Sequence, residues 1–185
     1  MKKIFLIFSI MFVGTTLIAY TYNIQDLCEA AGEGRIELID KIIKSGVSFD
    51  SQMKEGETPL MCGCATGKIE VVKYLVNKGA NIDKTDKIGK TPLFFSVQRN
   101  TSENVVVTKY LIEKKANVNT KLKTNGATPL IKASYTGNIE AVKLLLLAGA
   151  NINDKDNNGK TALKWAKEYK QNEIEKLLTK TGAKE

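Results

Sequence analysis

The chain has 185 residues, of which 43% are hydrophobic and 26% are charged. It carries 28 Lys and Arg residues against 20 Asp and Glu residues, and it contains no histidine, so its formal net charge is +8. The absence of histidine removes the commonest general base and a principal metal ligand. The basic residues are interleaved with acids, and no basic run mixed with aromatics occurs, so no nucleic-acid partner is expected.

Residues 1–22 differ in composition from everything that follows. Met1-Lys2-Lys3 gives a positive start, and residues 4–19 form a run of sixteen residues without a charge. This plan is typical of a secretory signal peptide and predicts export, with the mature protein periplasmic or secreted. Two alternatives stay open. Residues 4–19 could remain as an inner-membrane anchor, although the run is below the roughly 20 residues of a comfortable span, or the segment could be an ordinary cytosolic N-terminus.

The remainder of the chain repeats one unit, which is clearest between Thr128 and Asn153. A closing residue recurs at steps of 33, 36, 34 and 33, at Gly46, Gly79, Lys115, Gly149 and Gly182. The opening tripeptide recurs at Thr58, Thr91, Thr128 and Thr161, as T-P-L three times and T-A-L once. Two independent markers with one period indicate stacked supersecondary units.

Each part of the unit predicts a local structure. Thr128 before Pro129 is a helix start, because the hydroxyl accepts an N–H of the first turn and Pro occupies a position whose N–H has no partner. Gly137 can take the left-handed conformation that ends this helix. Apolar residues then recur at spacings of three and four between 139 and 146, which predicts a second, amphipathic helix. The segments 86–89 and 156–159 begin with Asp and end with Gly, as type I turns prefer.

The markers divide the chain into residues 1–22 and an array over 23–185. The predicted repeats span about 23–52, 53–85, 86–122, 123–155 and 156–185. The first repeat lacks the T-P-L element, and the fifth has Asn172, Glu175 and Thr179 where the fourth has apolar residues, so both have the character of end caps. The third is irregular: residues 99–104 add three residues to the predicted loop between its helices, and Lys115 replaces the closing glycine. An exposed loop insertion can be neutral drift or part of a binding face.

Three cysteines are the residues most open to a chemical interpretation. Cys62 and Cys64 stand two apart and point to different sides of a helix, so packing is their simplest role. A disulfide from Cys28 to Cys62 or to Cys64, and a reactive thiol, stay open as alternatives. Since no C-x-x-C pair, histidine, phosphate-binding loop or nucleophile elbow is present, we expect no metal site, no cofactor, no small-molecule substrate and no catalytic residue.

The repeated pattern resembles the ankyrin repeat, whose motif runs D-x-x-G-x-T-P-L-H-x-A-A, then a glycine, a helix with paired leucines, and G-A-x-x-N. The resemblance extends from about Asn23 to the C-terminus. At the motif's histidine this chain has Met61, Phe94, Ile131 and Lys164. The resemblance implies an all-α fold, a solenoid of stacked helix-turn-helix units joined by β-turn loops, with about four full or near-full repeats and an N-terminal half or cap repeat.

The resemblance also implies a function, which is binding of a protein partner through a concave surface of turn tips and inner helices. Carried onto this chain, the candidate binding residues are Lys87, Ile88, Lys90, Gln98, Arg99, Thr124, Asn125, Tyr135, Thr136, Asn157, Lys160 and Tyr169. Within this set Lys87, Lys90 and Arg99, with Tyr135 as an aromatic anchor, suggest an acidic partner. Two alternatives are a secreted effector acting on a host protein and a membrane-tethered structural or assembly protein.

Overall fold

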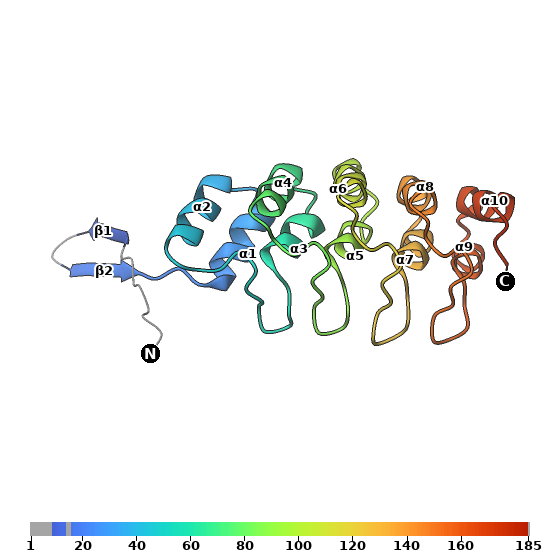
Figure 1. The fold of residues 1–185 in the computed structure, drawn as a ribbon, viewed down its shortest axis with the longest axis horizontal. Helices are drawn as coiled ribbons and strands as arrows, with labels where there is room; N and C mark the ends of the chain where they lie inside the picture. Colours follow the sequence, from blue (N-terminus) through green and yellow to red (C-terminus); the bar gives the residue numbers. More distant parts are fainter. Residues whose placement is uncertain (1–8, 14–15, 185) are drawn as a thin grey trace.

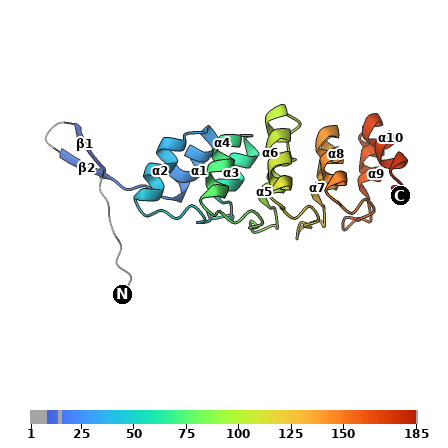
Figure 2. The same ribbon diagram turned by 45° about the horizontal axis from the view of Figure 1, so that its top comes forward.

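The computed structural model describes residues 9–13 and 16–184 of the chain. In that part, ten helices follow one another as five pairs arranged in single file (Figures 1 and 2). The first helix of each pair lies nearer the projecting loops and forms an inner row: α1 (Ile24–Glu33), α3 (Pro59–Ala65), α5 (Pro92–Ser96), α7 (Pro129–Thr136) and α9 (Ala162–Glu168). The second forms an outer row: α2 (Ile36–Lys44), α4 (Ile69–Asn77), α6 (Ser102–Glu113), α8 (Ile139–Leu147) and α10 (Asn172–Lys180). The predicted helical solenoid is confirmed.

The inner helices of the second to fifth repeats begin where the sequence predicts. Each is capped by a threonine whose hydroxyl accepts the backbone N–H three residues later: Thr58 from Met61 at 3.3 Å, Thr91 from Phe94 at 3.2 Å, Thr128 from Ile131 at 3.2 Å, and Thr161 from Lys164 at 3.3 Å. Three of the residues at the histidine position, Met61, Phe94 and Ile131, are buried. The N–H of Thr58 donates to the Met61 sulfur at 3.4 Å, so a thioether completes that cap.

The projecting loops are hairpin turns held by an aspartate in two of the repeats. The Asp86 carboxylate accepts the N–H groups of Ile88 and Lys90 at 3.0 and 2.8 Å, and Gly89, at φ 90°, donates to the Asp86 carbonyl. Asp156 holds the last hairpin in the same way. Neighbouring hairpins are joined by single backbone bonds, Lys87 to Glu55, Lys123 to Ile88 and Asn157 to Asn125. The loops therefore form a continuous ribbon along the array.

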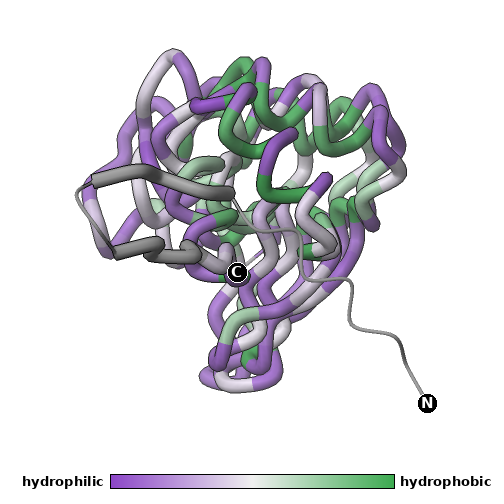
Figure 3. The backbone as a smooth tube through the Cα atoms, turned by 90° about the vertical axis from the view of Figure 1, so that its left-hand side faces the viewer, coloured by the Kyte–Doolittle hydropathy of each residue, from purple (hydrophilic) through white to green (hydrophobic). Residues whose placement is uncertain are grey.

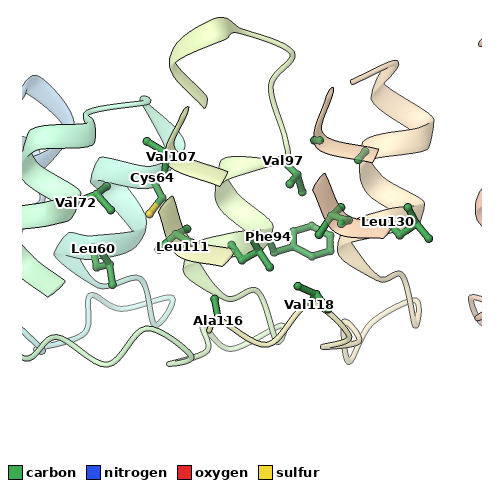
Figure 4. Packing of buried hydrophobic residues seen from close by; sticks show 14 of the residues in the cluster. Leu60, Cys64, Val72, Phe94, Val97, Val107, Leu111, Ala116, Val118 and Leu130 are labelled. Atoms are coloured by element: carbon green, nitrogen blue, oxygen red, sulfur yellow. The ribbon is translucent and has the colours of Figure 1, made fainter. Parts of the chain in front are cut away.

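The hydrophobic core runs the length of the stack and is shared between adjacent pairs. Hydrophobic segments gather in the helices, while the hairpins are mainly hydrophilic (Figure 3). Leu60, Phe94 and Leu130 of three successive inner helices are buried along one line, with Leu111 of an outer helix beside them (Figure 4). Each repeat thus buries its apolar side against the next one, as a solenoid requires.

The irregular third repeat differs from the expected long loop. The helix α6 begins at Ser102, capped by the Thr101 hydroxyl, so part of the insertion becomes an extra N-terminal turn of that helix. Asn104 in this first turn has a buried partner, because its Nδ2 donates to the Cys64 carbonyl at 2.8 Å. In the next repeat Asn138 donates to the Arg99 carbonyl at 3.1 Å in the same manner. These two amides link α6 to the end of α3 and α8 to the loop after α5, so each joins an outer helix to the preceding repeat.

The segment before the array contains the two strands of the described part. β1 (Ser9–Val13) pairs antiparallel with β2 (Thr16–Tyr20). The prediction of a signal peptide or anchor over residues 1–22 falls in part on residues 1–8 and 14–15, which lie outside the described residues. Among the helices that are described, none combines the length and the apolar character needed to cross a bilayer.

Candidate functional site

We define the inner face as the hairpin tips together with the solvent-facing sides of the inner helices. All twelve residues predicted from the sequence belong to it. Lys87, Ile88, Thr124, Asn125 and Asn157 lie in hairpins, Lys90 and Lys160 lie just before inner helices, and Gln98, Arg99, Tyr135, Thr136 and Tyr169 lie in or after inner helices. Lys90, Gln98, Thr136 and Lys160 are half-buried, and the others are exposed.

The predicted basic patch consists of Lys87, Lys90 and Arg99, and these residues lie before and after α5 along the chain. Lys87, in the hairpin before that helix, lies 3.8 Å from the Glu55 carboxylate, so part of its charge is offset. Lys90 places its amine 5.3 Å from the centre of the Phe95 ring. Arg99 lies in the loop after α5. The positive charge of this region is therefore spread along the inner face, and Lys90 is the member that stands beside an aromatic ring.

Three aromatic rings come together at the fourth and fifth repeats, and we call them the aromatic cluster: Tyr135 from α7, Trp165 from α9, and Tyr169 after α9. The Tyr135 ring meets Trp165 edge-on with 5.6 Å between centroids, and it meets Tyr169 at 4.4 Å and 64°. Tyr135 is 36% and Tyr169 48% exposed, so the cluster forms part of the surface. A hydrogen bond with Tyr135 raises the pKa of the Tyr169 hydroxyl.

A cavity of about 310 Å³ adjoins this cluster. We call it the aromatic groove, and its lining consists of the three rings, the apolar side chains Ala127 and Ile131, and the polar residues Asn125, Lys132 and Asp156. The Asp156 carboxylate accepts the Trp165 indole N–H at 2.8 Å, in addition to the two backbone N–H groups of its own hairpin. Its charge is therefore engaged by three donors, and the groove retains apolar walls with a basic residue at its edge.

Lysines surround the groove on two sides. Lys132 places its amine 4.8 Å from the Tyr135 ring centre, and Lys160 lies 4.5 Å from that of Trp165 while it pairs with Glu168 at 2.6 Å. Burial, reinforced by the positive charge of Lys90, lowers the pKa of Lys132. In the described part of the chain neither Lys90 nor Lys132 lies within 4.0 Å of a carboxylate oxygen. Neither amine therefore has a counter-ion among the described residues, and the charge of Lys90 acts on that of Lys132.

Sequence reasoning omitted several groove residues. Lys132 stands one helical turn before Tyr135, and this spacing places both on one side of α7, so it was a signal available from the sequence. Trp165 of the fifth repeat packs against the fourth repeat through its contact with Tyr135. Trp165 also lines the cavity, and Asp156 lines it while accepting the Trp165 indole N–H. The local sequence predicts neither of these roles.

The described residues contain no group of three or more His, Cys, Asp or Glu side chains that could hold a metal ion. All three cysteines are free thiols, with Cys28 and Cys64 buried and Cys62 half-buried. The arrangement offers a surface for recognition, formed by exposed rings, lysines and hairpin amides.

Comparison with known proteins agrees with this architecture. The chain is 32% identical over 137 residues to a Rickettsia felis protein named as an ankyrin repeat protein, covering 73% of this chain and 44% of that one. It is 39% identical over 61 residues to a Danio rerio protein named as the palmitoyltransferase ZDHHC13, covering 33% of this chain and 10% of the relative. The chain thus spans less than half the length of either relative. The family model described as "Ankyrin repeats (3 copies)" matches residues 27–121 and again 101–185. The protein belongs to the ankyrin repeat family.

Proposed function

We propose that this protein is an exported, non-enzymatic binding module whose inner face holds an acidic protein partner. Ankyrin repeats indicate a protein–protein interaction module in general. The aromatic cluster supports the choice of face, because partly exposed Tyr and Trp side chains beside cations are enriched at interfaces. In this proposal residues 23–185 form the binding domain, with repeats near the boundaries given above.

The charge distribution supports an acidic partner. Lys90 and Lys132 both add positive charge to the inner face, and each stands over an aromatic ring. An approaching carboxylate gains from both amines, and complementary charge also accelerates encounter. The positive start and uncharged run of residues 1–19 support export. The compartment of the mature protein would separate a periplasmic module from an effector acting on a host protein.

Partner capture with charge-reversed variants tests the function. Fractionation and N-terminal sequencing first locate the mature protein and show whether residues 1–22 remain. The purified protein then captures partners from that compartment at moderate salt, and mass spectrometry identifies them. We expect the partner to be lost when Lys87→Glu, Lys90→Glu and Arg99→Glu are combined.

A matched variant carries Lys73→Glu, Lys109→Glu and Lys143→Glu on the outer helices α4, α6 and α8, which gives the same change in net charge. This control should retain the partner. Equal capture by the inner-face and outer-helix variants would mean that the inner face is not the binding surface.

A further inference from the structure

We propose that the aromatic groove recognises a short acidic segment of the partner, in which one large apolar side chain enters the cavity and a flanking carboxylate pairs with Lys132, favoured also by the positive charge of Lys90. The inference rests on the proposed function and specifies the site and the chemistry that the partner must supply. Four features of the groove carry it: size, unpaired charge, occupied ring faces and ring orientation.

The size of the cavity limits its occupant to a side chain or a short segment. Its volume of about 310 Å³ lies at the lower end of the roughly 300–1,000 Å³ found for binding pockets. Ala127 and Ile131 are nearly fully buried and supply apolar surface beside the rings. An apolar side chain placed there is transferred from water to a surface formed by Ile131, Tyr135 and Trp165. This removal of apolar area from water is the favourable free-energy term in such a contact.

The two lysines need an anion. Lys90 and Lys132 repel each other, because the charge of Lys90 disfavours the charged form of Lys132. A carboxylate at Lys132, which lines the groove, would offset this repulsion and form a charge-assisted hydrogen bond at a partly desolvated position. Lys160 is not available to the same extent, since it already pairs with Glu168. A single carboxylate beside the apolar side chain therefore meets the requirement.

A cationic ligand fits the groove poorly although its walls are aromatic. Rings attract cations over their faces, but here lysine amines already occupy that position at Tyr135 and Trp165. A methylated lysine or another quaternary ammonium group would have to displace them against like charge. The occupied ring faces thus favour an anionic segment.

A single-stranded nucleic acid would need a flat stacking platform. Bases bind such proteins by lying parallel to successive aromatic rings. In the aromatic cluster the ring planes cross at 87° for Tyr135 with Trp165, at 64° for Tyr135 with Tyr169 and at 37° for Trp165 with Tyr169, so no two rings lie parallel. A side chain can fill the space between crossed rings, whereas a row of stacked bases cannot.

Selection from a random twelve-residue peptide library on the full chain tests the inference. We expect enriched peptides to carry a large apolar residue flanked by Asp or Glu. Trp165 is the one tryptophan of the chain, so binding should change the intrinsic tryptophan emission. Tyr135→Ala and the pair Lys90→Glu with Lys132→Glu should each weaken the selected peptide by about tenfold or more.

Two controls make the outcome interpretable. The pair Lys109→Glu with Lys143→Glu changes the net charge equally on the outer helices and should leave peptide affinity unchanged. Circular dichroism and urea unfolding show whether each variant is folded. If Tyr135→Ala is not folded, the milder pair Lys132→Gln with Tyr135→Phe replaces it. Enriched peptides without acids, peptides insensitive to the groove variants, or tight binding of a fluorescent oligothymidine probe would each overturn the inference.

The fate of the captured partner separates this inference from the proposed function. The partner could be lost from the variant with Lys87→Glu, Lys90→Glu and Arg99→Glu, yet bind the Tyr135→Ala variant as tightly as the parent chain. That result would support the inner face as the binding surface and would refute the groove as the recognition site. Retention of the partner by both inner-face variants would refute the proposed function itself.

Discussion

Single residues at helix ends decide how well this array tolerates departures from its motif. Lys115 occupies the closing position that glycine holds in the other repeats, and it has φ 67°. A left-handed conformation costs a non-glycine residue about 1–2 kcal/mol. The equivalent Gly79 and Gly149 have open space where a side chain would stand. The strain at Lys115 is therefore in the backbone and not in a contact.

The change Lys115→Gly should raise the free energy of unfolding by about 1 kcal/mol, because the relief of the left-handed strain exceeds the entropy cost of glycine. Urea denaturation followed by circular dichroism measures it. Lys114→Gly is the matched control, since Lys114 has φ −82° and gains no relief, so it should be neutral or destabilising. A Lys115→Gly protein no more stable than the parent would contradict the strain argument.

The cysteines differ in reactivity according to their surroundings. Hydrogen bonding with Cys28 lowers the pKa of Cys62, while the same contact and burial raise the pKa of Cys28. Complete burial raises the pKa of Cys64. Since the thiolate is the nucleophile, the half-buried Cys62 is the reactive thiol of the three.

Iodoacetamide at mildly alkaline pH should label Cys62 first, with Cys28 and Cys64 labelled after unfolding in urea. Peptide mass spectrometry resolves the three sites. The rate at Cys62 should reach half of its maximum at a lower pH than that of a free cysteine, because its thiolate forms below the ordinary thiol pKa. In a Cys62→Ala variant the fast phase should disappear, and early labelling at Cys64 would show that the core around α3 opens.

At the scale of the helix, a buried side-chain hydrogen bond holds α6 of the third repeat against the second repeat. Asn104 is 2% exposed and joins α6 to the last turn of α3 through the Cys64 carbonyl. Its own carbonyl accepts the Thr108 hydroxyl at 2.9 Å, and Thr108 lies 2.8 Å from the Ser96 hydroxyl. The extra turn of α6 is thus tied to both neighbouring inner helices by hydrogen bonds.

The change Asn104→Ala should lower the free energy of unfolding by about 1 kcal/mol, since it removes a buried hydrogen bond and leaves the Cys64 carbonyl with the Gly67 N–H, at 3.3 Å, as its donor. Asn104→Asp, which keeps the size but cannot donate and adds a buried charge, should cost at least as much at neutral pH. Asn153, which accepts a backbone N–H at an exposed site, is the control, and Asn153→Ala should cost less. Equal losses at the two positions would argue that water replaces the Asn104 donor.

For the whole molecule, the linear order of contacts predicts how unfolding spreads. Each helix pair packs against the pair before it and the pair after it. A destabilising substitution in one pair should therefore lower the stability of the adjacent pairs before that of distant ones. The fully buried Ile42 and Leu178 lie in α2 and α10, close to opposite ends of the stack. Trp165 reports on the fifth repeat, whereas circular dichroism reports on all helices.

Truncating a core residue at each end tests this order, as each change should cost about 2–5 kcal/mol locally. Leu178→Ala should move the Trp165 fluorescence transition to lower urea concentration than the circular dichroism transition. Ile42→Ala should lower the circular dichroism transition while the Trp165 transition stays closer to that of the parent chain. If both variants shift both signals alike, the array unfolds as one cooperative unit.

The sequence by itself determined the repeating architecture. Thr-Pro at helix starts, glycine at helix ends, Asp and Gly in the turns and the apolar spacing between them act within a few residues, so the period of 33–37 residues could be interpreted locally. It also selected Tyr135 and Tyr169, which are exposed, and Lys160, which is half-buried. It placed the insertion of the third repeat in a loop, because the partner of Asn104 belongs to another repeat.

Only the tertiary structure decided which residues of different repeats interact. The charge of Lys90 affects that of Lys132, and the Tyr135 ring contacts Trp165, although the members of each pair belong to different repeats. Those encounters depend on the offset and rotation between stacked repeats, which follow from how buried side chains such as Phe94 and Ile131 fill the space between them. Local patterns carry no record of that offset, so the aromatic groove became visible once the repeats were stacked.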